Sequence, residues 1–504
     1  MQASDRFTSG ASTQGFVSNA VPYLSAGAIA SGIPGSYEDQ WSLLSYFGRA
    51  TYNYDERYLL SVSLRGDGTS RFTDKYRFGY FPAVGLGWNI AKEAFFPQNT
   101  AVSNLKLRAS FGANGNQEIY TYQRFSRYSA GSNYQGSGSS VLGGITQGTI
   151  GNNDLRWETT YQYNGGLDLG LLNNRLTFTF DIYNKQTKDL LLDVPIPVST
   201  GAGSLSVTQN IGRVENKGIE IGLVTTNVQP KNGGFGWTTN FNVSGNRNRI
   251  VDLGTQVSDA GVTTSRSIIN SYSISQPGQA LGSFYGYQVQ GIFQSDAEGR
   301  AAATQNGAKG KAGDIQFRDV NGDGVINDQD RTIIGNPNPK AFAGVTNNFS
   351  FKGLELSVFF QGSFGNEIYN QNRQILESQS DPLNQSVSVL NHWSPINTNT
   401  DIPRPVRNDP NQNNRFSTRW VEDGSYVRLK NVTLAYTVPV GLSQRAAIKS
   451  LRVYATAQNL VTWTRYKGYD PEVSADPFSS TGFGRDYGVY PQSRTYTVGL
   501  NANF

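Results

Sequence analysis

Apolar and polar residues alternate along much of this chain. Between Tyr58 and Leu64 the apolar set is Tyr58, Leu60, Val62 and Leu64, with Ser61 and Ser63 between them. Successive side chains of a β-strand point to opposite faces, so a period of two predicts strands with one apolar and one polar face. Other sets with this spacing are Tyr80/Pro82/Val84/Leu86/Trp88/Ile90, Leu105/Leu107/Ala109/Phe111, Leu176/Phe178/Phe180/Ile182, Leu354/Leu356/Val358/Phe360, Val432/Leu434/Tyr436/Val438 and Tyr496/Val498/Leu500/Ala502/Phe504.

The length of these runs indicates a membrane. With their flanks they reach roughly 9–12 residues, the length that a tilted strand needs to cross the hydrocarbon layer. Strands of soluble sandwiches are more often about five or six residues long. Because each unpaired backbone group in hydrocarbon costs several kcal/mol, a sheet that spans lipid must close into a barrel.

The connections between the runs alternate in length. Short turns are predicted at Tyr54-Asp55-Glu56-Arg57, Leu172-Asn173-Asn174, Gln229-Pro230-Lys231-Asn232, Gln276-Pro277-Gly278-Gln279 and Phe351-Lys352-Gly353. Long polar loops are predicted near 66–78, 114–154, 188–213, 251–268, 295–340, 366–423 and 464–489. Short turns on one side and long loops on the other are typical of an outer-membrane barrel, with the periplasm below and the exterior above.

A strand count follows from this alternation. If the last strand descends to Phe504, a short descending strand near Ser271–Gln276 keeps turns and loops on their own sides. We therefore predict an all-β fold, a transmembrane antiparallel β-barrel, with about fifteen strands that start near Leu43–Asn53. Residues 1–40 are then an extracellular loop or the start of a fragment, and residues 41–504 form the C-terminal portion of a larger plugged barrel of about 22 strands. The plug and about seven strands would precede this chain.

Composition excludes several functions. The chain has no cysteine, which removes thiol catalysis, thiolate metal sites and disulfides. Its formal net charge of +5 comes from scattered Lys and Arg, so we expect no nucleic-acid partner. Met1-Gln2-Ala3-Ser4 does not begin a signal peptide, which for an exported protein also suggests a fragment.

The C-terminus resembles an assembly signal. Thr497, Gly499, Ala502 and Phe504 form a polar residue, a glycine and two apolar residues at the last alternate positions. The outer-membrane assembly machinery could read such a terminal strand by strand addition. The alternative is simply a strand that ends in phenylalanine.

One acidic loop has the spacing of a calcium site. Side-chain oxygens stand at positions 1, 3, 5, 9 and 12, and Gly324 stands at position 6, where the chain must turn. The candidate ligands are Asp319, Asn321, Asp323, the Val325 carbonyl, Asn327 and Asp330. We predict a structural Ca²⁺ that makes an extracellular loop rigid; the alternative is an Asx/Gly turn without a metal.

Other candidate chemistry is weaker. His392 is the only histidine, so a Ser-His-Asp arrangement would have to use it, but a single loop histidine is more often a plain polar residue. Asp470/Glu472 and Glu422/Asp423 would suit glycoside hydrolysis only if they faced each other across a sugar. Aromatic residues near strand ends favour interfacial girdles, whereas Trp393 and Tyr134, in loops, are candidates for stacking on sugars.

Several stretches together resemble the barrel of SusC/RagA-type TonB-dependent outer-membrane transporters. They keep the family's order over residues 41–504, and they are Arg65-Gly66-Asp67-Gly68-Thr69-Ser70-Arg71-Phe72, Tyr76-Arg77-Phe78-Gly79-Tyr80-Phe81-Pro82, Ser103-Asn104-Leu105-Lys106-Leu107-Arg108-Ala109-Ser110-Phe111-Gly112, Asp330-Arg331-Thr332-Ile333-Ile334-Gly335-Asn336-Pro337-Asn338-Pro339, Asp423-Gly424-Ser425-Tyr426-Val427-Arg428-Leu429-Lys430-Asn431-Val432 and Gly468-Tyr469-Asp470-Pro471-Glu472. The resemblance implies a Bacteroidota outer membrane and active import of glycans or peptides. It also implies two partners: a SusD-like lipoprotein that lids the barrel, and the TonB–ExbB–ExbD complex, which would act through the missing N-terminal part.

Two other classes remain open at this stage. A surface or secreted β-rich carbohydrate-binding protein, such as an adhesin, would be soluble without detergent and would lack a lipid-facing belt. A β-rich glycosidase would need a pocket with opposed carboxylates. Neither charge nor aromatic content separates oligosaccharide from peptide cargo.

Overall fold

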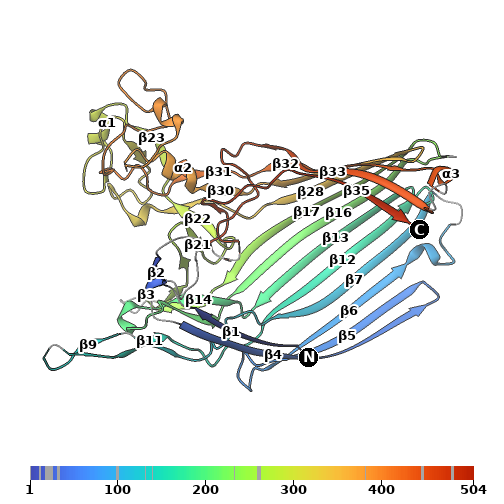
Figure 1. Cartoon of the computed structure of the whole chain (residues 1–504), viewed down its shortest axis with the longest axis horizontal. Coiled ribbons are helices and arrows are strands. Elements are labelled where there is room, and N and C mark those ends of the chain that lie inside the picture. The colour runs from blue at the N-terminus through green and yellow to red at the C-terminus, as the bar shows by residue number, and fades with distance from the viewer. Residues whose placement is uncertain are drawn as a thin grey trace.

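Fourteen strands form one antiparallel sheet in which neighbours along the chain are neighbours in space (Figure 1). The computed structural model describes residues 2–10, 13–16, 27–30, 35–97, 101–130, 132–138, 140–231, 233–257, 263–380, 382–443, 448–477, 479 and 482–504. In order, the strands of the sheet are β1 (Gln2–Gly10), β4 (Gly35–Tyr54), β5 (Tyr58–Thr69), β6 (Phe78–Asn89), β7 (Val102–Asn116), β12 (Glu158–Leu171), β13 (Leu176–Lys188), β16 (Arg213–Val228), β17 (Gly236–Asp252), β28 (Ala341–Phe351), β29 (Leu354–Phe364), β32 (Tyr426–Thr437), β33 (Ser450–Thr464) and β35 (Thr495–Asn503).

The start of the sheet differs from the prediction. Residues 2–10 do not lie in a loop; they form β1, which pairs with β4 from Gln2↔Leu43 to Gly10↔Gly35. The alternation missed this strand because Phe7 is its only large apolar residue. The first sheet strand is therefore β1, and β4 is longer than the predicted Leu43–Asn53.

The predicted descending strand near Ser271–Gln276 is also wrong. Its centre is β21 (Ser273–Ser275), which belongs to a separate four-stranded sheet with β20 (Ile268–Ile269), β22 (Ser283–Gly286) and β27 (Thr332–Gly335). All three side chains of β21 are buried, so it has no lipid-facing side. The loops predicted near 251–268 and 295–340 are thus parts of one connection between β17 and β28. With β1 added, turns and loops alternate over fourteen described strands rather than about fifteen.

The pairing register confirms that the sheet has two chemically different faces. Phe180 pairs with Ile221 and Leu167, and Ile221 pairs with Val243, so apolar side chains align across strands. This apolar face is open: Leu86, Ile182 and Val498 expose 56%, 54% and 80% of their surface. The opposite, polar face carries the residues between them, including Asp181, Glu220 and Ser244. Exposed apolar rows on paired strands are the belt that contacts lipid.

Aromatic side chains lie at both ends of the apolar face. At the end of the short turns, the rings of Trp237 and Phe349 stack 5.7 Å apart. At the end of the long loops, Phe111 stacks with Tyr161 at 6.3 Å and lies 5.1 Å from Tyr163. This arrangement is that of two interfacial girdles.

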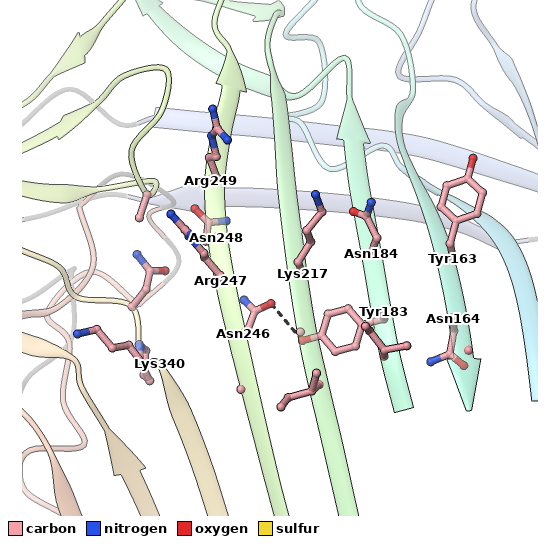
Figure 2. Close-up of a pocket in the computed structure, with 18 of the residues that line it drawn as sticks. Tyr163, Asn164, Tyr183, Asn184, Lys217, Asn246, Arg247, Asn248, Arg249 and Lys340 are labelled. Atoms are coloured by element: carbon pink, nitrogen blue, oxygen red, sulfur yellow. Dashed lines mark hydrogen bonds between the residues drawn. The ribbon is translucent and has the colours of Figure 1, made fainter. Parts of the chain in front are cut away.

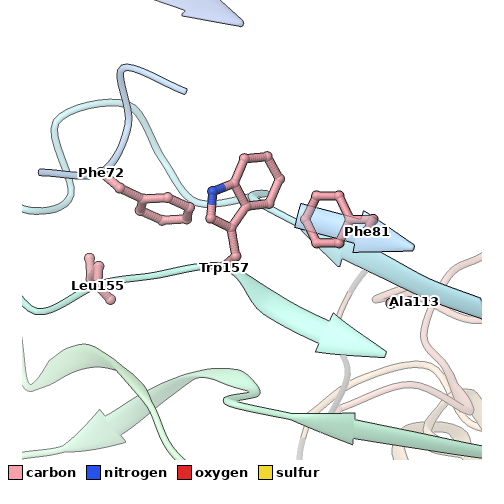
Figure 3. Packing of buried hydrophobic residues seen from close by; sticks show 5 residues of the cluster. All are labelled: Phe72, Phe81, Ala113, Leu155 and Trp157. Carbon is pink, nitrogen blue, oxygen red and sulfur yellow. The ribbon is translucent and has the colours of Figure 1, made fainter. Parts of the chain in front are cut away.

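A buried cluster fixes the loops that follow β5 and β7 (Figure 3). Trp157 contacts Phe72 and Phe81 edge to face, with ring centroids 5.7 and 5.4 Å apart. Its indole Nε1 donates to the Arg77 carbonyl oxygen at 3.0 Å. Leu155 and Ala113 complete the cluster.

The remaining elements are short and lie in the connections. The helices α1 (Asp296–Ala301), α2 (Gln371–Leu376) and α3 (Val440–Ser443) have four to six residues. Among the described residues, no helix has the length and apolar character needed to cross a membrane. The short strands are β2 (Thr13–Phe16), β3 (Gly27–Ala30), β8 (Arg127–Ala130), β9 (Tyr134–Gln135), β10 (Val141–Leu142), β11 (Ile145–Thr149), β14 (Leu191–Pro195), β15 (Ser206–Asn210), β18 (Thr255–Val257), β19 (Thr263–Ser265), β23 (Val289–Ile292), β24 (Thr304–Gln305), β25 (Ile315–Phe317), β26 (Val325–Ile326), β30 (Glu367–Asn370), β31 (Val421–Asp423) and β34 (Arg485–Asp486).

Candidate functional site

The polar face carries a charge cluster on three adjacent strands. Arg108 on β7 contacts Asp168 on β12 and Asp181 on β13, with Nη2–oxygen distances of 2.8 and 2.9 Å. Gly166 stands between them, and a Cβ there would lie 2.7 Å from the Arg108 guanidinium carbon. Because Gly166 has no side chain, the Arg108 guanidinium can extend across β12 to reach Asp181. One cation between two carboxylates leaves one net negative charge within this cluster.

Next to this cluster runs a ladder of amides. The Tyr183 hydroxyl donates to Asn246 Oδ1 at 3.1 Å. Asn246 and Asn248 both donate through Nδ2 to Asn216 Oδ1, at 3.1 and 3.0 Å. Tyr183 lies over Gly218, where a Cβ would be 2.4 Å from the phenol oxygen. Such a surface offers hydrogen bonds to a polar solute with little charge selectivity.

The long connections after β17, β29 and β33 fold together into an extracellular lobe, formed by the described residues of 253–340, 365–425 and 465–494. Its core contains Tyr272 and Phe284 from the first connection and Tyr369 and Trp420 from the second. The sheet β31-β30-β34 joins the second connection to the third. Figure 1 shows the lobe around α1, α2 and β23 beyond one end of the sheet.

Buried charge also holds this lobe together. Arg419 and Arg373 lie 4.2 and 5.5 Å from the ring of the fully buried Trp420. Burial lowers the pKa of Arg419 to about 10, although Glu377 at 3.3 Å opposes that shift. Arg373 contacts Glu377 and Glu422 at 3.1 and 2.9 Å. The lobe is therefore a packed unit, not a set of independent loops.

One ion cluster ties the lobe to the sheet. Arg428, on the polar face of β32, is 1% exposed and contacts Asp470 at 2.6 Å and Glu472 at 2.8 Å. Lys430 also contacts Glu472, at 3.1 Å. Asp470, Glu472 and Glu422 are thus engaged in ion pairs, and Asp423 pairs with Glu367 in the sheet of β31. The predicted pairs Asp470/Glu472 and Glu422/Asp423 therefore do not face each other across a pocket.

The acidic loop folds as a series of Asx turns. Asp319 accepts hydrogen bonds from the backbone N–H groups of Gly322 and Gly324, at 2.7 and 2.8 Å. Asn321, Asp323 and Asn327 each accept one from the residue two positions later. Each of these oxygens keeps a second lone pair, and oxygen donors of this kind suit calcium. The Ca²⁺ site stays a prediction; among the described residues, no three His, Cys, Asp or Glu side chains gather as metal ligands.

Asp330 closes this loop. It is fully buried, and its two oxygens accept hydrogen bonds from Val320 N and Asn327 N, both at 2.8 Å. Replacing Asp330 with alanine leaves two donors without an acceptor, which costs about 1–3 kcal/mol each. We expect faster hydrogen exchange across 319–330 in this variant, whereas Asp323→Ala, on the exposed side, removes one acceptor and should speed exchange only at Val325. We also expect millimolar Ca²⁺ to slow exchange in the unmodified loop; an unchanged rate would contradict the calcium prediction.

The C-terminal residues lie where the assembly signal requires a strand. Thr497, Gly499 and Ala502 belong to β35, which pairs with β33 alone in the described sheet, and Phe504 follows it with its ring exposed. A Cβ on Gly499 would lie 2.5 Å from the Tyr454 ring, so a larger residue at this position would displace that ring. Recognition by the assembly machinery stays a prediction.

Two further candidates have structural roles. The Nδ1 atom of His392 lies 2.9 Å from the Val389 carbonyl oxygen, at the end of a short 3-10 helix, Val387–Asn391. Trp393 is buried and donates to Gln294 at 3.0 Å, so its ring is not available to stack on a sugar. Tyr134, in contrast, is 60% exposed.

The sheet and its lining define the wall of an outer-membrane β-barrel, with lipid on the apolar face and water on the polar face. The family model described as "TonB dependent receptor-like, beta-barrel" matches residues 4–460, and the chain belongs to this family. It is of the SusC/RagA type.

Named relatives support the assignment to this family. The chain is 38% identical over 502 residues to TonB-dependent receptor P3 of Formosa agariphila, covering 98% of this chain and 49% of the relative. It is 32% identical to TonB-dependent receptor SusC of Bacteroides thetaiotaomicron, covering 93% and 44%. The chain also resembles a solved structure, the RagAB peptide transporter, with a TM-score of 0.81 and 29% identity. The alignment covers 100% of this chain and 52% of the chain in that structure. The chain thus spans about half the length of the curated relatives it matches.

Proposed function

We propose that this chain forms the channel wall of an importer that takes up oligosaccharides or peptides across the outer membrane by a TonB-dependent mechanism. The observation that carries the proposal is the polar face: the amide ladder of Tyr183, Asn246 and Asn216 offers hydrogen bonds to polar cargo. The charge cluster around Arg108 lies on the same face. Both cargo classes present the amides or hydroxyls that such groups bind.

Two partners complete this proposal. A SusD-like surface lipoprotein would close the barrel over the extracellular lobe, whose buried core makes it a firm docking surface. The TonB–ExbB–ExbD complex would supply energy through parts of the receptor that precede the barrel. The description of one solved relative as the RagAB peptide transporter supports a peptide as one cargo class.

Growth of a deletion strain tests the function. We expect a strain without the full-length receptor, or without TonB, to lose growth on at least one oligosaccharide or peptide source. The double variant Asn216→Leu/Asn246→Leu removes hydrogen bonds worth about 0.5–1.5 kcal/mol each, so we expect uptake to fall about tenfold. The matched control is Ile219→Leu on the apolar face. Unchanged growth of the deletion strain on every source would contradict the proposal.

A further inference from the structure

Five cations form a basic band on the apolar face of the sheet. They stand at the extracellular ends of three adjacent strands, are all exposed, and are Lys188 on β13, Arg213 and Lys217 on β16, and Arg247 and Arg249 on β17. The register places Lys188 opposite Arg213 and Lys217 opposite Arg247. Two carboxylates, Glu215 and Asp252, share these rows, so five cations and two anions leave a net charge of +3.

Most of this charge is not neutralised within the chain. Lys217 contacts Glu215 at 2.8 Å, and the Lys188 ammonium lies 5.2 Å from the Tyr161 ring. The side chains of Arg247 and Arg249 make no hydrogen bond or ion pair with any residue that the structure describes. Two arginines two positions apart on one strand point to the same side, and their guanidinium groups favour phosphate oxygens.

The height of the band corresponds to the lipid headgroups. The row of Lys217 and Arg247 stands two residues above the row of Ile182 and Ile219, which is about 7 Å along the strand. Below that row the apolar face continues through Phe180, Ile221 and Val243. The cations therefore begin where the apolar belt ends, on the side of the long loops, which is the outer leaflet.

A cavity of 1240 Å³ includes Lys217, Arg247 and Arg249 of the band in its lining (Figure 2). Its lining includes the apolar side chains of Leu86, Phe111, Ile182 and Ile219, together with Lys217 and Arg247. The lining also includes Tyr183, Asn246 and Asn248 of the amide ladder on the polar face. The assignment of the basic band to the lipid side therefore rests on the strand register rather than on the cavity.

We propose that the basic band binds a phosphorylated lipid of the outer leaflet. Its phosphates would contact Lys217, Arg247 and Arg249, and an acyl chain would lie along the apolar rows below them. Charge complementarity argues for a phosphorylated lipid over a zwitterionic one. The site faces away from the channel, so it goes beyond the proposed import function and does not depend on it.

Lipid binding can be measured on the intact receptor that contains this chain. The purified, delipidated receptor is titrated in detergent with diphosphorylated lipid A, with the same lipid after removal of its phosphates, and with phosphatidylethanolamine, and bound lipid is counted by native mass spectrometry. We expect the diphosphorylated lipid to bind at least about tenfold more tightly than the other two. The triple variant Lys217→Gln/Arg247→Gln/Arg249→Gln should lose this preference.

The matched control removes three cations from the polar face: Arg49→Gln/Lys106→Gln/Lys185→Gln. It should keep the preference, and heat-modifiable gel migration verifies that both triple variants fold. Equal binding of the phosphorylated and dephosphorylated lipids overturns the proposal, as does unchanged binding in the first variant. If that variant binds lipid normally but loses its lipoprotein partner, the band is a protein interface and the lipid proposal is wrong.

Discussion

Replacing Arg428 with methionine is expected to destabilise the attachment of the extracellular lobe by about 3–5 kcal/mol. Arg428 is buried, and its guanidinium donates to Asp470, Glu472 and the Thr462 hydroxyl at 2.6, 2.8 and 2.8 Å. Methionine leaves Asp470, itself 4% exposed, without its cation. Asp470 keeps the backbone donors of Glu472 and Gln492, but a buried carboxylate without a counter-charge must draw in water or take up a proton, and both open the packing.

Hydrogen exchange of the intact receptor measures this effect in the described part of 465–494, where Asp470 and Glu472 lie. The matched control is Arg452→Met on the adjacent strand β33. Its ion pair with Glu355, at 3.0 Å, joins two side chains that are 35% and 50% exposed, so its loss should cost at most about 1 kcal/mol. Similar exchange rates in both variants would show that the Arg428 cluster does not anchor the lobe.

The apolar face was predictable because its signal is local and repeated. Leu86, Ile182 and Val498 each lie in a run where the period of two reads directly from the sequence. Residues 2–10 carry no such run, since Phe7 is their only large apolar side chain, and only pairing with β4 makes them a strand. The error at Ser271–Gln276 has a different cause. Only the order of turns and loops predicts this strand, and the turn at Gln276–Gln279 lies inside one long connection between β17 and β28.

The charge clusters could not be predicted from the sequence, because only the pairing register of the strands brings their residues together. Asp168 and Asp181 stand 60 and 73 residues from Arg108 in the sequence. Each looks like an isolated polar position until strand pairing brings all three together. The acidic loop shows the contrast: its donors lie within twelve residues, so the spacing predicted a tight turn at Asp319 and Gly324 that the structure contains.

A charge placed at the middle of the apolar face is expected to have the next largest effect. Val243 on β17 pairs with Ile221 and Ala343, about halfway between Trp237 at one girdle and Arg247 in the basic band. Val243→Arg puts a guanidinium into hydrocarbon at this depth, which costs about 2–4 kcal/mol. The urea midpoint of the receptor folded into lipid vesicles, followed by heat-modifiable migration, should fall accordingly.

Ser244→Arg is the matched control, because it puts the same side chain one residue further along the same strand. Ser244 lies on the polar face opposite Glu220, where an arginine has water and a carboxylate partner. We therefore expect this variant to keep the urea midpoint of the unmodified receptor. The difference between the two variants measures which face touches lipid, independently of cargo, calcium or partners. Equal destabilisation by the two substitutions, or a larger loss at Ser244, would contradict the orientation of the whole sheet, because all fourteen strands are joined in one register and must turn the same face outward.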